Sequence, residues 1–207
     1  ISAAGRRGNG ETQAPVISGD GAFVAFMSLA NDLVNSDNSL MDVFLGEVAT
    51  GTLVAASRRD AGIPWVPWTG NSPSQLVDSR SRSISSDGAY VAFYSMATDL
   101  VSGGSGPSTW NVYLWERSTG TTTLVSESVS AAGQRGDNSS EQPVISADGA
   151  YVAFSSSATD LVSGGSGPST GNVYLWERST GMTTLVSESV SAAGQRGDGG
   201  TQQLVIS

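Results

Sequence analysis

The stretch VISADGAYVAFSSS, at Val144–Ser157, decides the fold because it recurs along the chain. Two copies precede it, VISGDGAFVAFMSL at Val16–Leu29 and SISSDGAYVAFYSM at Ser83–Met96. Each copy has an Asp-Gly pair between two apolar runs, and this pair favours a tight turn because both residues accept left-handed backbone angles. The β-branched and aromatic residues after the turn are typical of a strand. Each copy therefore predicts a strand, a turn and a second strand.

The copies belong to longer repeating units, since Asp87 and Asp148 are 61 residues apart in nearly identical surroundings. The opening segment Ile1–Ser18 aligns without gaps to Val129–Ser146 and to Val190–Ser207. We therefore expect a segment of a longer repeat array, whose units stack on their neighbours. The predicted division is a tail of a preceding unit at 1–13, units at 14–80, 81–141 and 142–202, and the first strand of a following unit at 203–207.

Each unit is predicted to form four strands, which in the second unit span about 82–85, 89–95, 110–117 and 121–128. The third of these strands, WNVYLWER, has apolar Val112 and Leu114 on one face and Tyr113 and Trp115 on the other. A sheet that is apolar on both faces has to be covered on both faces. Small sheets that stack about an axis meet this need in a β-propeller. We predict an all-β propeller segment of three four-stranded blades, either part of a larger propeller or half of a six-bladed ring.

Composition narrows the classes of function. The chain of 207 residues has a formal net charge of -9, and its ten basic residues are all Arg. An acidic chain with scattered Arg is unsuited to nucleic acid, which needs clustered basic residues. The sequence has no Cys and no His, which removes thiolate chemistry and the commonest general base. No apolar run approaches the length of a membrane-spanning helix, so we expect no membrane insertion. From the charge pattern we also expect no binding to nucleic acid.

The repeat resembles the WD40-like β-propeller repeat of the TolB type, also called PD40. The matching residues are S-A-D-G-A-Y-V-A-F-S-S at Ser146–Ser156, N-V-Y-L-W-E at Asn172–Glu177, and the Thr180-Gly181 turn. The long unit is most similar to the secreted bacterial variety of this family. The resemblance implies an extracellular or periplasmic bacterial protein that binds or assembles, and it implies no reaction, so we expect no enzyme and no required cofactor.

A cation site is one hypothesis for the first unit. Asp37, Asn38 and Asp42, in NSDNSLMDVF, resemble the D-x-N…D loop of the family, and closely spaced oxygen ligands suit Ca²⁺. The alternative is a polar turn, because the later units have Gly-Ser-Pro loops at this place.

Other acidic residues are interpreted as structural. Asp20, Asp87 and Asp148 lie in the Asp-Gly turns, where bonds from backbone to side chain account for them without a catalytic role. The link after the second strand also repeats an Asp, and we expect it to be structural. These residues are Asp32, Asp99 and Asp160.

The tryptophans fall into two groups. Trp115 and Trp176 are at matching positions of the third strand, and we expect them to pack between blades. Trp65, Trp68 and Trp110 have no equivalents in the repeat, so they are candidates for ligand binding. The first two lie in an insertion, IPWVPWTGNSPSQLV, and could stack on a sugar, anchor a partner or cap a blade.

Three stacked blades leave two sheet faces bare. If each bare face shows four apolar side chains at roughly 1.5–3 kcal/mol apiece, on the order of 6–12 kcal/mol of burial is missing per face. We therefore expect a protein partner, or self-association through the open blade faces. The main hypothesis is a non-enzymatic scaffold. Alternatives are a carbohydrate-binding or lyase-like propeller that uses the Trp65 and Trp68 loop, and a subunit of a surface filament.

Overall fold

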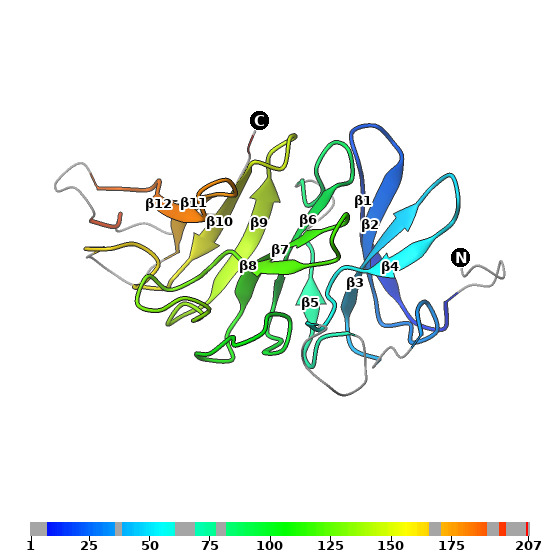
Figure 1. Cartoon of the computed structure of the whole chain (residues 1–207), viewed down its shortest axis with the longest axis horizontal. Helices are drawn as coiled ribbons and strands as arrows, with labels where there is room; N and C mark the ends of the chain where they lie inside the picture. Colours follow the sequence, from blue (N-terminus) through cyan, green and yellow to red (C-terminus); the bar gives the residue numbers. More distant parts are fainter. Residues whose placement is uncertain are drawn as a thin grey trace.

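The computed structural model describes residues 8–35, 39–60, 69–77, 82–165, 171–189, 195–197 and 206. These residues form three four-stranded antiparallel sheets, which lie side by side like the ribs of a fan (Figure 1). Within these ranges there is no helix, and so no helix that could cross a membrane. The predicted all-β fold with three four-stranded blades is confirmed.

In every sheet the strands pair in chain order. Sheet 1 consists of β1 (Thr12–Ile17), β2 (Phe23–Ser28), β3 (Asp42–Glu47) and β4 (Leu53–Ala55). Sheet 2 consists of β5 (Ser74–Gln75), β6 (Tyr90–Ser95), β7 (Asn111–Glu116) and β8 (Thr122–Leu124). Sheet 3 consists of β9 (Ser140–Ile145), β10 (Tyr151–Ser156), β11 (Asn172–Glu177) and β12 (Met182–Leu185).

The first strand of each sheet starts earlier than the sequence predicts. In sheet 2 it is β5, at Ser74–Gln75, and the predicted strand at 82–85 contributes only an isolated bridge from Ile84 to Val91. In sheet 3 the strand is continuous but bulged, with Gln142 at a positive φ of 55° before a proline. A bulge and a proline both interrupt the ladder. The polar half of the strand, upstream of the bulge, therefore carries no sequence signal of its own.

The Asp-Gly turn is held by the side chains that the repeat preserves. In the third copy Ser146 donates its hydroxyl to Asp148 Oδ1 at 2.6 Å, and the Ala150 N–H donates to the same oxygen at 2.9 Å. The Tyr151 N–H in turn donates to the Ser146 hydroxyl at 3.0 Å. Gly149 takes a positive φ of 70°, as the turn requires. The other two copies repeat these bonds.

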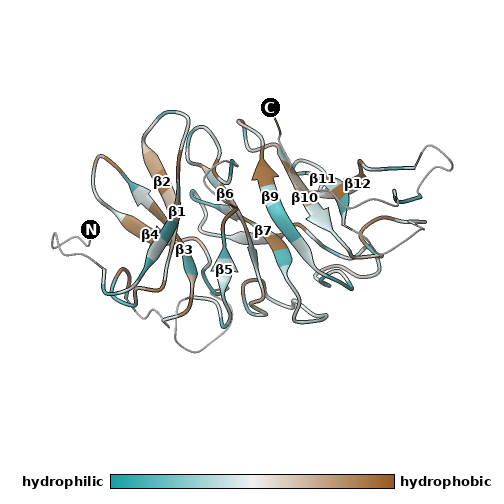
Figure 2. Ribbon diagram, turned by 180° about the vertical axis from the view of Figure 1, so that it is seen from behind, coloured by the Kyte–Doolittle hydropathy of each residue, from teal (hydrophilic) through white to brown (hydrophobic). Residues whose placement is uncertain are grey.

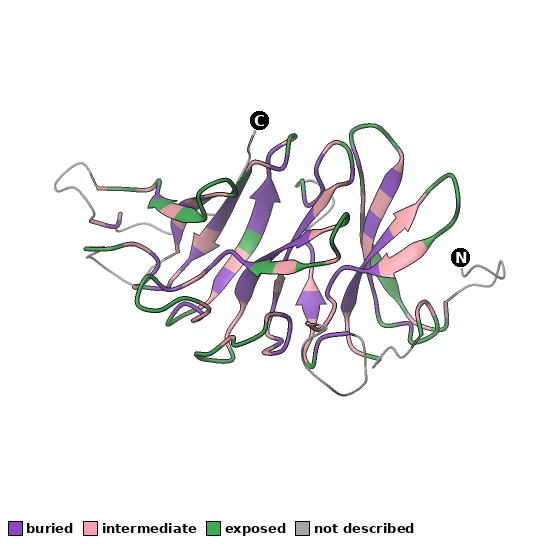
Figure 3. Ribbon diagram, in the orientation of Figure 1, coloured by how far each residue is buried: buried purple, intermediate pink, exposed green. Residues whose placement is uncertain are grey.

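The three sheets pack through two hydrophobic cores. One lies between sheets 1 and 2 and the other between sheets 2 and 3. Buried residues run along the strands in Figure 3, and Figure 2 shows apolar stretches on β2, β4 and β9. Trp115 and Trp176 are 2% and 4% exposed and belong to the first and the second core respectively. The prediction that these two tryptophans pack between blades is confirmed.

Candidate interaction site on the open sheet faces

Each sheet has two chemically different faces. We call the face toward the preceding sheet the front and the face toward the following sheet the back. In sheet 2 the front buries Val91 and three aromatic side chains against sheet 1, namely Phe93, Tyr113 and Trp115. Its back buries smaller side chains against sheet 3, namely Ala92, Val112, Leu114 and Val125. The repeat therefore pairs a mainly aromatic front with an aliphatic back.

An arginine stacks on an aromatic ring at both occupied interfaces. The guanidinium of Arg117, in sheet 2, lies 4.3 Å from the centre of the Phe23 ring in sheet 1. The guanidinium of Arg178, in sheet 3, lies 4.4 Å from the centre of the Tyr90 ring in sheet 2. Each arginine also donates from Nε to the turn glycine of its own sheet, at 3.1 and 2.9 Å respectively. This geometry combines a cation–π contact with a fixed side-chain direction.

The turn glycine packs against the same aromatic ring. A Cβ at Gly88 would lie 2.2 Å from the Phe23 ring, and a Cβ at Gly149 would lie 2.4 Å from the Tyr90 ring. The aromatic residue is therefore enclosed by a glycine and an arginine of the next sheet. Sequence reasoning explained the glycines only by their backbone angles and missed the arginines. The recurring E-R-S-T-G at the end of the third strand was the available signal.

Backbone hydrogen bonds also join adjacent sheets. The Ser86 N–H donates to the Ala147 carbonyl at 2.8 Å, and the Asp20 N–H donates to the Ser86 carbonyl at 2.9 Å. At the start of the first strand, the Ser140 N–H donates to the Trp110 carbonyl at 2.8 Å. These hydrogen bonds fix the position of each sheet relative to the next sheet.

The back of sheet 3 is open. Val186 is 56% exposed, whereas Val125, at the same position of sheet 2, is fully buried. Tyr151, at the position of Phe23 and Tyr90, is 38% exposed. The back of sheet 3 thus has the chemistry of an interface, and no sheet formed by the described residues covers it.

The front of sheet 1 is only partly open, because Val24 and Phe26 are half-buried and Phe44 is fully buried. Its chemistry also differs from that of the back of sheet 3. It keeps the stacked aromatic pair of the repeat, Phe26 on Phe44, with ring centres 5.6 Å apart. Gly46 stands where the other sheets have tryptophan. Val48, which is 59% exposed, stands where they have the stacking arginine. The two open faces are therefore not equivalent partners.

The candidate cation ligands do not all fall in the described part of the chain. Asp37 and Asn38 lie outside the described residues, so the hypothesis of a Ca²⁺ site stays a prediction. Asp42 is fully buried at the start of β3 and accepts a hydrogen bond from the Ser57 hydroxyl at 2.7 Å. Asparagines occupy this position in sheets 2 and 3 and accept the equivalent bond, so Asp42 has a structural role there. Among the residues that the structure places, no cluster of three or more acidic side chains could hold a metal ion.

Hydrogen bonds within the turns lower the pKa of all three turn aspartates. The Ser146 hydroxyl and the Ala150 N–H lower the pKa of Asp148, and the Ser18 hydroxyl and the Ala22 N–H lower the pKa of Asp20. The pKa of Asp87 is lowered by the same two kinds of donor. A carboxylate that is held by donors on its own turn is poorly suited to act as a general acid.

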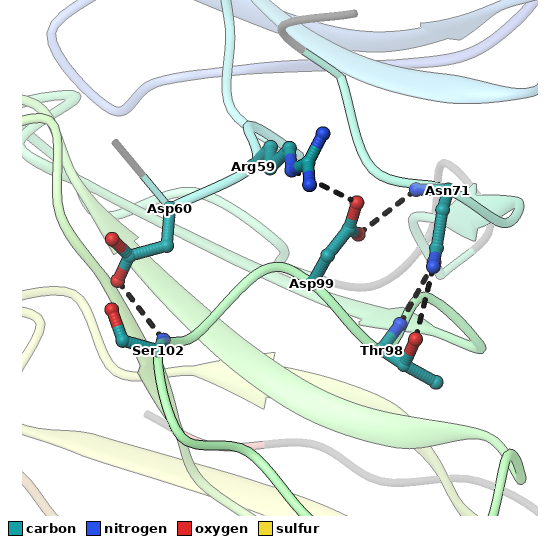
Figure 4. Close-up of polar contacts among 6 residues, drawn as sticks. All are labelled: Arg59, Asp60, Asn71, Thr98, Asp99 and Ser102. Atoms are coloured by element: carbon teal, nitrogen blue, oxygen red, sulfur yellow. Dashed lines mark hydrogen bonds and ion pairs between the residues drawn. The ribbon is translucent and has the colours of Figure 1, made fainter. Parts of the chain in front are cut away.

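The repeated aspartate of the link forms a reciprocal clamp, shown for the second unit in Figure 4. The Asn71 N–H donates to Asp99 Oδ1 at 2.9 Å, and the Thr98 N–H donates to Asn71 Oδ1 at 2.9 Å. The other units contain the same exchange, between Asn9 and Asp32 and between Asp137 and Asp160. The structural role that we predicted for these aspartates is visible here, and sequence reasoning missed their partners.

Two residues at the end of the first unit add charged contacts to this clamp. Arg59 Nε lies 3.4 Å from Asp99 Oδ2, and the Ser102 N–H donates to Asp60 Oδ2 at 3.0 Å (Figure 4). At the end of the second unit, Ser128 and Val129 stand at the positions that Arg59 and Asp60 occupy in the first unit. The junction of the first two units therefore has charged side chains at two positions where the next junction has uncharged ones.

The candidate ligand-binding tryptophans are only partly placed. Trp65 and Trp68 lie outside the described residues, so their role stays a prediction. Trp110 is half-buried, with its ring edge-on to Tyr94 at 5.1 Å between centres. This packing accounts for Trp110 within sheet 2 and does not test ligand binding.

Comparison with solved structures gives low similarity over most of the chain. TolB from Acinetobacter baumannii is 14% identical with a TM-score of 0.34, and a putative TolB from Agrobacterium tumefaciens is 13% identical with a TM-score of 0.42. Oligogalacturonate lyase from Vibrio parahaemolyticus is 11% identical with a TM-score of 0.43. The matches cover 86%, 87% and 87% of this chain, but only 43%, 63% and 42% of those proteins.

No protein-family model and no curated protein matches the sequence. Membership of the TolB-type repeat family therefore stays a prediction. The blade architecture is read directly from the three sheets of this chain.

Proposed function

We propose that this chain is a non-enzymatic β-propeller segment that works as an assembly scaffold by binding further sheets on its open faces. The observation that carries the proposal is the contrast between Val125, fully buried, and Val186, 56% exposed at the matching position. The same apolar side chain is part of a core in one unit and faces water in the next. An exposed apolar surface built as an interface is typical of a docking site.

The free energy that would be gained by burying the apolar side chains of the open faces supports this function. Fully burying one aliphatic side chain contributes about 1.5–3 kcal/mol, so four such side chains contribute on the order of 6–12 kcal/mol per face. The whole stability of a domain is about 5–15 kcal/mol. Val173, Leu175 and Phe26 are half-buried and Phe44 is fully buried, so covering either face would contribute only part of this amount.

A non-enzymatic role is supported by the use of the acidic residues. The turn aspartates are bonded within their own turns, and the link aspartates are bonded in the clamps. The sequence contains neither His nor Cys to act beside them. As part of the proposal we place the protein in the bacterial envelope or outside the cell, which is the setting that the resemblance of its repeat implies.

The test is a chain that carries one more unit. Because Val190–Ser207 aligns with Val129–Ser146, a copy of residues 147–207 added after Ser207 continues the repeat in phase. We expect the amides of β11 and β12 to exchange as slowly as those of β7 and β8, and the free energy of unfolding to rise. A matched control carries the added residues in scrambled order.

The parent chain and the control should keep fast exchange in β12. If the added unit changes neither the exchange of β12 nor the free energy of unfolding, the scaffold proposal is wrong.

A further inference from the structure

We infer that the open back face of sheet 3 is selective for one kind of partner, a sheet whose front carries the Trp and Arg of sheets 2 and 3. This inference rests on the proposed function and names its partner. The open front face of sheet 1 lacks both residues, so a second copy of this chain is not that partner.

The two occupied interfaces define what a back face accepts. Trp115 is 2% exposed within the first core, and Trp176 is 4% exposed within the second. A buried tryptophan removes on the order of 150–250 Å² from water, so it dominates the contact area. Arg117 and Arg178 add the stack on the aromatic ring of the preceding sheet. Tryptophan and arginine are also the residues that most often dominate binding energy at interfaces.

Sheet 3 presents the receiving half of this arrangement. Tyr151 is the aromatic ring of the stack, and it is 38% exposed, whereas Phe23 is 8% exposed beneath its arginine. Val173 and Leu175 are half-buried, and their counterparts in sheet 2 are buried beneath Trp176 and its neighbours. A sheet that brings a tryptophan and an arginine would therefore find the same surface that sheet 2 offers to sheet 3.

The front of sheet 1 cannot make these contacts. Gly46 has no side chain to fill the space that tryptophan fills, and Val48 has no charge to stack on Tyr151. Head-to-tail stacking of two copies would leave an unfilled space at the centre of the contact. Such a space forfeits the contacts of the atoms that line it.

The backbone of sheet 1 nevertheless accepts a side chain at Gly46. A Cβ at Gly46 would lie 3.5 Å from Leu53 Cδ1 and 3.8 Å from the Val24 carbonyl, which are ordinary contacts. Gly46 does not have a positive φ, and Val48 is exposed. The double substitution Gly46→Trp, Val48→Arg therefore gives sheet 1 the front of sheets 2 and 3 on an unchanged backbone.

This variant tests the inference by sedimentation velocity over a range of protein concentrations. We expect the variant to associate head to tail at least tenfold more tightly than the parent chain, whether into closed dimers or into open stacks. Adding Tyr151→Ala should return the association to the level of the parent. Adding Tyr151→Phe, which keeps the ring and matches Phe23, should leave it intact.

The inference is overturned if the double variant associates no more tightly than the parent, or if Tyr151→Ala leaves its association unchanged. A reciprocal variant covers the case in which the double variant does not fold. In the chain with the added unit, the copies of Trp176 and Arg178 are replaced by Gly and Val. We expect β12 to lose the protection that the unaltered unit gives.

If β12 stays protected under this altered unit, the face is not selective, although the scaffold proposal stands. If even the unaltered unit gives no protection, the scaffold proposal itself fails. The two failures are therefore distinguishable.

Discussion

Sheets 2 and 3 contain the same third strand, NVYLWER, yet the two copies have different surroundings. In sheet 2 this strand is covered on both faces, and Leu114 is 3% exposed. In sheet 3 the front face is covered in the same way, whereas the back face is open and Leu175 is half-buried. Identical sequences therefore reach different burial because, within the described part of the chain, only one of them is followed by another sheet. Comparing these two strands therefore shows how much burial a neighbouring blade adds to a sheet.

The largest effect that we expect is a difference in the free energy of unfolding between alanine variants of Leu114 and Leu175. Leu114→Ala leaves a cavity between sheets 2 and 3 and should lower the free energy of unfolding by about 2–5 kcal/mol. Leu175→Ala should cost less than half as much, since water already reaches that side chain. Chemical denaturation of the two variants measures both losses. Equal losses would mean that the back of sheet 3 is covered in solution.

The second prediction compares two turn glycines. Gly21→Ala and Gly88→Ala both force alanine into a positive φ, which costs roughly 1–2 kcal/mol. At Gly21 the new methyl group meets open space, whereas at Gly88 it lies 2.2 Å from the Phe23 ring. Overpacking of this kind costs about 1–3 kcal/mol more. Thermal unfolding should rank Gly88→Ala as the less stable variant, and the reverse order would contradict the packing of that turn against sheet 1.

The third prediction concerns acid. The pKa of Asp87 is lowered by the Ala89 N–H and the Ser85 hydroxyl, so the stability that its carboxylate contributes is present above its ordinary pKa of 3.8. It is lost as pH falls through the lower pKa of the folded state. Asp87→Asn should therefore be destabilised near neutral pH and approach the parent chain in acid. Ser85→Ala removes one donor and should show a smaller difference of the same sign.

Melting temperatures measured across the acid range decide this point. A deficit for Asp87→Asn that stays constant from neutral pH into acid would show that the carboxylate charge is not what holds the turn.

The smallest effect concerns the stacking arginines. Arg178 contributes to the lowered pKa of Asp148, after the hydrogen bonds of the turn. Arg178→Met should therefore raise that pKa slightly and remove a cation–π contact of about 0.5–2 kcal/mol. Asp20 has no arginine at this place, since Val48 occupies it, and it is instead affected by Asp87. The pKa of Asp20, followed by NMR in the same titration, should not move in the variant and provides the control.

Much of the fold could be predicted because the repeat presents each signal three times. The Asp-Gly turns, the second and third strands, and the packing of Trp115 and Trp176 all follow from local pattern. The first strand could not be placed, because a bulge at Gln142 divides it and its upstream half is polar. That half pairs through buried serine hydroxyls, such as Ser140 with Ser156 at 2.7 Å, which no hydrophobic pattern reveals.

The candidate site was predictable only in outline. Counting three blades indicated two open faces, but not that the faces differ. The difference depends on Gly46 and Val48, which are unremarkable in sequence until the structure sets them beside Trp115 and Arg117. Likewise, the partners of the link aspartates are 23 to 28 residues away, so a local pattern could not identify them.

By itself the sequence determined the kind of element at each position and the number of sheets, because turn chemistry and apolar alternation act over a few residues and repeat with the unit. Only the tertiary structure decided which face of each sheet is bulky and which residues cross from one sheet to the next. It also decided where the apolar surface stays exposed. The physical reason is that burial is a property of a residue and its neighbour together, so the same NVYLWER is covered in one sheet and half open in the next.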